Sequence, residues 1–187
     1  MNYYITKVSS FSDEKLKDYF IFLDEEKKEQ YLKTTNENRK KCLLVSHGFL
    51  KEKVSEIYNI KKEDLVFSVS ESGKPFCKSH KEIHFSISHS GDFIAVAINE
   101  KKVGIDIELF KKPSEKIIER VCSESEKNLI NSSENKEKTF TEIWTKKEAY
   151  LKALGTGIDR ELKGVDTTIL NFITEEHEDF ILSVFSL

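Results

Sequence analysis

The chain has 187 residues, a length that fits one compact domain or two small halves sharing a core. Charged residues make up 34% and hydrophobic residues 38%, which excludes a disordered chain, and the formal net charge of -3 gives no argument for a nucleic-acid partner. The three cysteines form no C-x-x-C pair, so we expect no disulfides. The N-terminus shows no signal-peptide pattern and no apolar stretch is long enough to span a membrane, so we expect a cytoplasmic protein.

The first sixty residues predict a short strand followed by helices. The strand covers residues 3–5, and two charge-rich segments with spaced apolar positions, 12–24 and 25–32, predict helices after it. From residue 36 to 57 the apolar residues recur at steps of three and four, which is the period of a long amphipathic helix. The other face of this helix is basic.

The middle of the chain predicts three strands. Residues 83–88 and 103–108 alternate between apolar and polar, and residues 93–98 form a short apolar run between them. The two connections are short enough for hairpins. We therefore expect these three strands to form an antiparallel meander.

The helical pattern returns after Pro113. Apolar residues from Thr139 to Leu154 lie on one stripe, and Gly155 supplies a helix stop. Segments 169–173 and 180–185 then predict a final hairpin around an acidic turn. Together the elements predict an α+β chain.

Asp106 and Glu108 form the first candidate site. They lie two residues apart on a predicted strand, so both carboxylates project from the same face. A hard cation such as Mg²⁺ binds through one or two carboxylates and completes its coordination with waters and substrate phosphates. The pair therefore suggests a magnesium–phosphate site, although the exposed polar face of an edge strand gives the same pattern.

Glu148 lies on the helix predicted from residue 139 to 154. It follows Trp144 by four residues and precedes Lys152 by four, so the three share a face that borders the buried stripe. A partly desolvated carboxylate there is suited to complete a metal site or to act as a general base. An ordinary surface Glu–Lys pair has the same spacing.

The segment from Ser86 to Gly91 ends a predicted strand in a tight turn. It places hydroxyls, an imidazole and free backbone N–H groups at one rim, which can hold a phosphate. Ser88 and His89 are adjacent on the strand and point to opposite faces, which argues against a serine hydrolase. A capped hairpin with a solvent-facing histidine is an equal alternative.

Basic residues give another reason to expect an anion site. Lys74 lies in a turn before Pro75, whose φ is locked, and more cations gather around the first predicted helices. Together they could bind a polyphosphate, although solvated surface charges look the same in a sequence. The cations near the first helices are Lys27, Lys28, Arg39, Lys40 and Lys41.

Cys77, His80 and His84 have a spacing that suggests zinc. No fourth ligand lies nearby in the sequence, and the three residues span a loop and a strand rather than one helix. We therefore expect them to be unrelated to a metal.

Four motifs occur in a fixed order along the chain. They are Gly73–Pro75, Phe85–Gly91, Val103–Glu108 and Trp144–Lys152, followed by Gly-Thr-Gly at 155–157. In this order and combination they closely resemble the Sfp-type 4'-phosphopantetheinyl transferase family, over about residues 20 to 160. The resemblance implies two similar α/β halves packed as a pseudo-dimer, with an antiparallel sheet in each and coenzyme A in the cleft between them.

The resemblance also implies a boundary between the halves. We expect an N-terminal half at residues 1–100, on the nucleotide side of coenzyme A. We expect a C-terminal half at residues 101–187, which contains the magnesium site. Because the chain after residue 157 has room for only one hairpin, we expect the sheet of this second half to be shortened.

Roles for the acidic residues follow from the same resemblance. Asp106, Glu108 and Glu148 are implied as the ligands of Mg²⁺, or of Mn²⁺ in its place. Lys152 is implied as the lysine that neutralises the reacting pyrophosphate. Glu126 falls where the family often has another acidic residue near the metal.

Contacts with coenzyme A are implied for a second set of residues. Lys74, Ser88 and His89 would contact its nucleotide end. The 3'-phosphate would be reached by His89 and by basic residues near Lys27 and Arg39.

The implied reaction transfers 4'-phosphopantetheine from coenzyme A to a serine of an apo acyl or peptidyl carrier protein. The serine attacks the β-phosphorus and expels adenosine 3',5'-bisphosphate, while Glu148, or a water that it orients, accepts the serine proton. We expect a monomer. The main alternative is a carboxylate–metal phosphodiesterase or nuclease, because D-x-E with a remote Glu and Lys is also a two-metal pattern. The second alternative is a non-catalytic module that binds carrier proteins or nucleotides.

Overall fold

In the computed structural model, which describes residues 1–156 and 162–187, two three-stranded antiparallel sheets lie face to face. The strand order is β1-β5-β4 in the N-terminal sheet and β6-β8-β7 in the C-terminal sheet. The strands of the first sheet are β1 (Asn2–Lys7), β4 (His84–Ser90) and β5 (Phe93–Asn99). The strands of the second are β6 (Val103–Leu109), β7 (Ile173–Glu176) and β8 (Phe180–Ser186).

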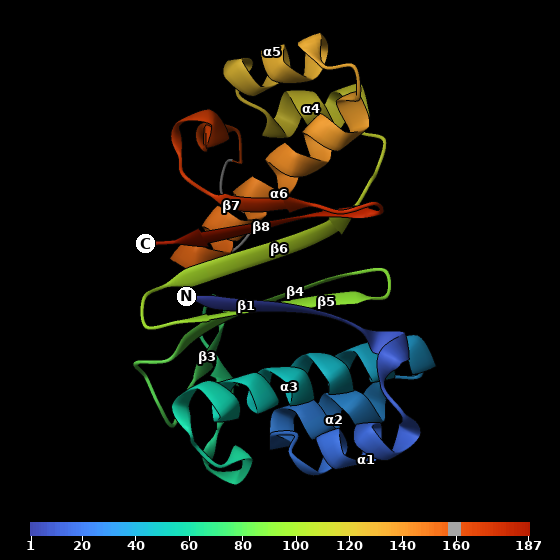
Figure 1. Ribbon diagram of the computed structural model, residues 1–187, viewed down its shortest axis with the longest axis vertical. Coiled ribbons are helices and arrows are strands. Elements are labelled where there is room, and N and C mark those ends of the chain that lie inside the picture. Colours follow the sequence, from blue (N-terminus) through green and yellow to red (C-terminus); the bar gives the residue numbers. More distant parts are fainter. Residues whose placement is uncertain (157–161) are drawn as a thin grey trace.

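A long helix covers the outer side of each sheet. Figure 1 shows α3 (Glu37–Tyr58) below the N-terminal sheet and α6 (Lys136–Leu154) above the C-terminal sheet. The layers are therefore helix, sheet, sheet and helix. The predicted fold class, α+β with two similar halves packed against each other, is confirmed.

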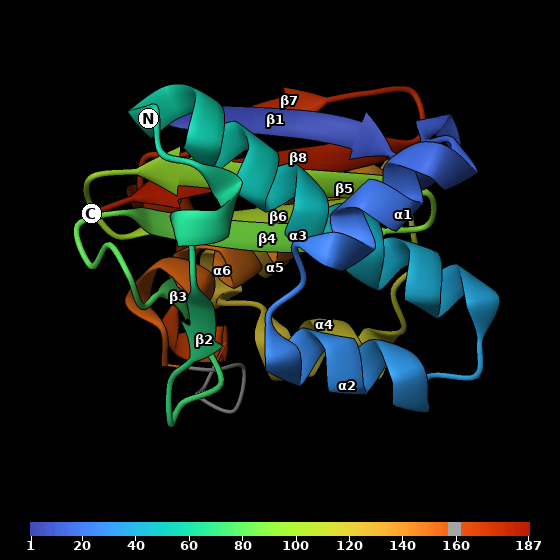
Figure 2. The ribbon, with the colours of Figure 1, turned by 90° about the horizontal axis from the view of Figure 1, so that it is seen from below.

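The remaining helices and strands are attached to these four layers. The N-terminal half adds α1 (Asp13–Ile21), α2 (Glu25–Lys33) and a small hairpin of β2 (Phe67–Val69) and β3 (Pro75–Cys77). The C-terminal half adds α4 (Glu115–Val121) and α5 (Glu124–Ser132). Figure 2 shows α3 crossing the N-terminal sheet while α2 lies to one side of it. No helix in the described ranges has the length and apolar content needed to span a bilayer.

Short polar side chains begin most of these helices. A Ser or Asn at the N-cap accepts a hydrogen bond from the backbone N–H three residues later, which satisfies a donor that has no partner inside the helix. The helix α2 differs, because its N-cap residue Asp24 makes no such bond. The residues that do cap a helix in this way are Ser12, Asn36, Ser114, Ser123 and Asn135.

Strand β5 separates two hydrophobic cores. Its large residues, Ile94, Val96 and Ile98, pack toward α3, whereas Ala95 and Ala97 face the second sheet. The alternation follows from the two-residue period of a strand. Small residues on the shared side let the two sheets approach each other.

The prediction of a three-stranded meander is wrong for its third strand. Strands β4 and β5 pair as expected, but β6 pairs with β8, with Asp106 opposite Ser183. A short connection and an alternating pattern fit a crossing between stacked sheets as well as a hairpin. The partner of β6 lies far along the chain, so the local pattern did not contain it.

The C-terminal hairpin begins later than predicted. Residues Thr167–Ile169 form a turn of 3-10 helix, and the strand pairing starts at Ile173. Ile169 is 80% exposed, so its apolar character does not mark a buried strand. Gly157 of the last predicted motif lies outside the described residues.

Candidate active site

Helix α6 lies directly on strand β6, because Gly104 has no side chain. A Cβ at this position would lie 1.9 Å from the carbonyl oxygen of Ala149 in α6. The close approach brings Glu148 and Lys152, which are one helical turn apart, to the side chain of Asp106 in β6. The three side chains that the sequence singled out on two separate elements therefore come together.

Asp106 is nearly buried, with 5% of its surface exposed. Its Oδ1 accepts hydrogen bonds from Lys152 Nζ at 2.6 Å and from Ser88 Oγ at 2.7 Å, but its Oδ2 is buried without a partner. Burial raises the pKa of Asp106, and the neighbouring Lys152 opposes this shift. One oxygen of this carboxylate is thus satisfied by the protein and the other is not.

Glu148 shares the same environment. It is 4% exposed, and its Oε1 is also buried without a hydrogen-bond partner. Burial, together with the negative charge of Asp106, raises the pKa of Glu148 to about 7. Unpartnered buried carboxylate oxygens are costly, and two carboxylates near enough for the charge of one to raise the pKa of the other form a donor set that suits a hard cation.

Glu108 stands at the end of the same strand and is less buried. Its Oε2 accepts hydrogen bonds from Ser90 Oγ and from Lys111 Nζ, both at 2.8 Å. Within residues 1–156 and 162–187, no three His, Cys, Asp or Glu side chains converge closely enough to hold an ion. Two carboxylates are sufficient for Mg²⁺ where waters and substrate phosphates supply the other ligands.

Serines of β4 join the two halves at this site. Ser86 Oγ accepts a hydrogen bond from the N–H of Ile105, and Ser90 Oγ accepts one from the N–H of Leu109, each at 3.1 Å. Ser88 and Ser90 also donate to the carboxylates of Asp106 and Glu108. The hydroxyls therefore both bridge β4 to β6 and orient the two acidic side chains. The sequence did not predict the role of Ser90. Serines at residues 86, 88 and 90 lie on the same face of one strand, and this pattern could have indicated it.

Lys74 contacts the end of the same helix. Its Nζ donates to the carbonyl oxygens of Lys152 at 2.5 Å and Ala153 at 3.0 Å, in the last turn of α6. Burial lowers the pKa of Lys74. Lys74, Glu148 and Lys152 also line one cavity of about 210 Å³, which places the predicted Gly-Lys-Pro turn beside the carboxylates.

A larger cavity of about 780 Å³ adjoins the N-terminal half, and it brings together Lys27, Arg39 and His89. Its lining includes Phe85 and Ile87, which also line the smaller cavity, so the two cavities adjoin at these residues. Ser88 instead faces the opposite side of β4, toward Asp106. Three of the five predicted coenzyme A contacts therefore share the larger cavity, and Lys74 and Ser88 lie nearer the carboxylates.

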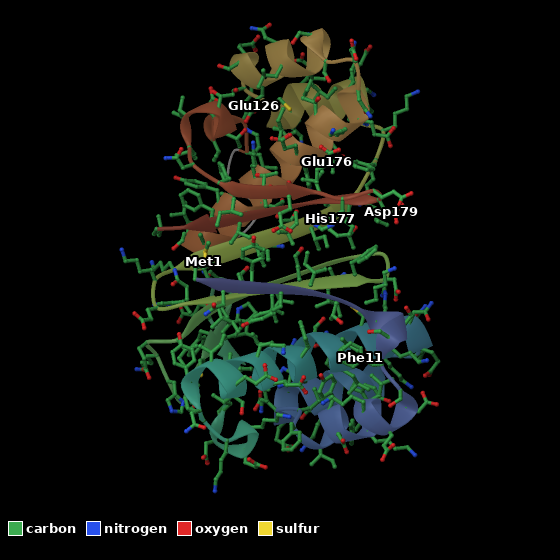
Figure 3. All side chains as sticks on the ribbon, in the orientation of Figure 1. Met1, Phe11, Glu126, Glu176, His177 and Asp179 are labelled. Atoms are coloured by element: carbon green, nitrogen blue, oxygen red, sulfur yellow. The ribbon has the colours of Figure 1, made fainter. Side chains whose placement is uncertain are left out.

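Glu126 does not lie at this site. It is fully buried in α5, where Lys147 Nζ contacts its Oε2 at 2.7 Å and Thr167 donates two hydrogen bonds to its Oε1. Figure 3 labels Glu126 among the outer helices of the C-terminal half. Lys147 also donates to the carbonyl oxygens of Leu162 and Val165. The expectation that Glu126 lies near the metal is wrong, and the residue instead holds the segment after residue 161 against α6.

We predict that Lys147→Met lowers the free energy of unfolding by about 3 kcal/mol, because it leaves the Glu126 carboxylate buried without its cation. Urea denaturation measures the loss. The double variant Glu126→Gln, Lys147→Met should recover most of it, since neither charge is then buried alone. Lys146→Met is the matched control: Lys146 forms a more exposed pair with Glu142, and the expected loss is below about 1 kcal/mol. Equal losses in the two single variants would contradict the assignment.

Comparisons with known proteins agree in the family that they indicate. The sequence model of the 4'-phosphopantetheinyl transferase superfamily matches residues 102–185, and that of the N-terminal part of 4'-phosphopantetheinyl transferases matches residues 10–101. The 4'-phosphopantetheinyl transferase ffp of Bacillus subtilis is 30% identical over 175 residues, which are 92% of this chain and 75% of that protein. Sfp of Bacillus subtilis (strain 168) is 29% identical with the same coverage. The transferase gsp of Aneurinibacillus migulanus is 33% identical over 73% of this chain and 57% of its own length.

Proposed function

This chain belongs to the 4'-phosphopantetheinyl transferases, and we propose that it carries out their reaction at Asp106, Glu148 and Lys152. The reaction transfers the phosphopantetheine arm of coenzyme A to a serine of a carrier protein. The observation that supports this site is the pair of buried oxygens without partners, Asp106 Oδ2 and Glu148 Oε1, beside the ammonium of Lys152. Family membership sets aside the alternatives of a phosphodiesterase, a nuclease and a non-catalytic module.

The carboxylates fit a divalent cation. Asp106 and Glu148 would hold Mg²⁺, or Mn²⁺ in its place. Glu108, the third ligand expected from the sequence, would join them only if its side chain left Ser90 and Lys111. When bound, the ion supplies positive charge to the diphosphate of coenzyme A. Lys152 holds Asp106 in place through its ion pair and adds a second positive charge near the reacting phosphates.

Glu148 is placed to accept the proton of the attacking serine, either directly or through a water that it orients. The pKa of about 7 belongs to the site without its cation, and a bound cation would lower it and keep the carboxylate ionised. The serine oxygen then bonds to the β-phosphorus, and adenosine 3',5'-bisphosphate leaves. The positive charge of Lys152 stabilises the negative charge that develops on the leaving phosphate.

The larger cavity is the proposed site for the nucleotide end of coenzyme A. Lys27, Arg39 and His89 line it, and their positive or hydrogen-bonding groups suit the 3'-phosphate. Lys74 lines the adjoining smaller cavity with Glu148 and Lys152, where the diphosphate would lie, and Ser88 contributes by orienting Asp106. In this arrangement residues 1–100 supply the nucleotide side and residues 101–187 supply the carboxylates.

The partners follow from this assignment. The second substrate is an apo acyl or peptidyl carrier protein, whose serine reaches Glu148. Because both sides of the site come from one chain, we propose that the protein acts as a monomer. We propose a cytoplasmic location, where coenzyme A and carrier proteins are available.

The assignment predicts a defined covalent product. Incubation of the protein with coenzyme A, MgCl₂ and an apo carrier protein should raise the carrier's mass by one phosphopantetheine, as measured by intact mass spectrometry. A carrier whose target serine is replaced by alanine should gain nothing, and EDTA should stop the reaction because the carboxylates then lack their cation. An unchanged carrier in the complete mixture, or full activity in EDTA, would contradict the proposal.

A further inference from the structure

A buried cluster of polar and charged side chains lies at the wall of the larger cavity, and the transfer reaction does not use it. The cluster consists of Asp24, which precedes α2, and of His47 and Lys51, which are one turn apart on α3. His47 is 6% exposed and Lys51 is 4% exposed. Asp24 and His47 both line the cavity that we assign to the nucleotide.

The carboxylate of Asp24 joins three elements. Its Oδ1 accepts a hydrogen bond from Lys51 Nζ at 3.2 Å, and its Oδ2 accepts one from the backbone N–H of Phe67 in β2 at 3.2 Å. His47 Nε2 lies 2.9 Å from Oδ2, and burial lowers the pKa of His47. Burial acts to raise the pKa of Asp24, but the contacts with His47 and Lys51 outweigh it and leave the pKa below its usual value.

Helix α2 has little else to hold it. It has no buried residue, and Leu32 is 72% exposed. Its aromatic contact is between Tyr31 and Phe20, whose ring centroids lie 5.1 Å apart. Tyr31 is partly buried and packs against the N-terminal core, whereas the other residues of this nine-residue helix are polar or exposed, so the helix depends on a few tertiary contacts for its position.

Asp24 occupies the N-cap position of this helix without capping it through its side chain. Its backbone carbonyl accepts hydrogen bonds from the N–H groups of Lys27 and Lys28, so the residue is continuous with the first turn. Its side chain is bonded to α3 and β2 instead. The carboxylate thus links the start of α2 to the body of the protein, one turn before Lys27.

We propose that Asp24 is a positioning residue that anchors α2 so that Lys27 faces the nucleotide of coenzyme A. The inference rests on the proposed function, because it takes the larger cavity as the nucleotide site. Asp24 does not touch the ligand in this role. It acts through the helix that follows it.

The direction in which one substitution changes the affinity for coenzyme A separates this positioning role from a simple charge effect. Coenzyme A is an anion, so removal of a carboxylate near its site should tighten its binding if charge alone matters. If Asp24 positions α2, then Asp24→Asn should weaken the binding, because Lys27 loses its fixed place. Asparagine is as good as aspartate at a helix N-cap, so the change leaves the start of the helix intact.

The experiment compares Asp24→Asn with Glu25→Gln. Glu25 is the next residue, its side chain is 87% exposed, and its substitution removes the same charge from the same helix. For Asp24→Asn we expect the KM for coenzyme A to rise about tenfold and kcat to stay within about twofold. For Glu25→Gln we expect both to stay near the wild-type values. Hydrogen exchange of residues 25–33 should be faster in Asp24→Asn and unchanged in Glu25→Gln.

A double variant keeps the test valid if Asp24→Asn is unstable. Asp24→Asn, Lys51→Met removes the lysine charge that would be left buried alone, so its stability should recover while the KM for coenzyme A stays raised. A wild-type KM in the recovered double variant, or tighter coenzyme A binding in Asp24→Asn, would overturn the inference. A wild-type protein that transfers no phosphopantetheine would instead overturn the proposed function, and the hydrogen-exchange comparison would still test the anchor by itself.

Discussion

Glu148→Gln should lower the rate of phosphopantetheine transfer by about a thousandfold. The amide keeps the shape of the side chain, but it neither accepts the serine proton nor serves as an anionic ligand. The same change should stabilise the fold. It removes a buried carboxylate that has no partner on Oε1 and lies beside the negative charge of Asp106. Without metal, we expect the melting temperature to rise by about 3 °C, equivalent to about 1 kcal/mol.

Carrier mass gain with time measures the first effect, and calorimetry in EDTA measures the second. Glu142→Gln is the matched control on the same helix, because Glu142 is more exposed and forms a surface pair with Lys146. It should leave both rate and melting temperature near the wild-type values. Transfer by Glu148→Gln at more than a tenth of the wild-type rate would exclude Glu148 as base and ligand.

Gly104→Ala should destabilise the protein by at least about 4 kcal/mol, or prevent it from folding. The added methyl group would lie 1.9 Å from the carbonyl oxygen of Ala149 and 2.5 Å from the amide nitrogen of Ala153. Both are backbone atoms of α6, so no side-chain rotation relieves the overlap. The helix would have to move away from β6.

Urea denaturation followed by Trp144 fluorescence measures the loss, since this is the one tryptophan of the chain. Gly164→Ala is the control, because a Cβ there meets no atom within 4 Å, and its effect should stay within about 0.5 kcal/mol. Should Gly104→Ala fold, displacement of Glu148 and Lys152 from Asp106 should slow transfer. Equal stability of the two alanine variants would refute the close packing of α6 on β6.

The local elements could be predicted from the sequence because their causes are local. The apolar period from residue 36 to 57 and the cap at Asn36 define α3, and Gly155 ends α6 with a φ of 77°. The partner of β6 could not be predicted in this way. Whether Val103–Leu109 pairs with β5 or with β8 depends on packing against α6, and that packing depends on residues far away in the sequence.

The residues of the candidate site also differ in whether local sequence patterns could predict them. Asp106 and Glu148 were found because strand and helix periods place each on a definite face, and the ordered motifs connected them. The cluster around Asp24 gave no signal, because a buried polar contact between residues 24 and 47 follows no period. Glu126 was misplaced because its burial with Lys147 depends on the segment after residue 161.

The division of the proposed site between two sheets has a consequence for shorter proteins built on the same plan. Each sheet completes its own strand pairing, so one half could exist as a separate polypeptide. One half alone would contain only part of the site: either the cavity with His89 or the carboxylate of Asp106. Such a protein would need a second copy of itself to supply the missing cavity or carboxylate. Each copy would then have to carry both the cavity and the carboxylate. Linking the halves in one chain removes that constraint and leaves each half free to specialise.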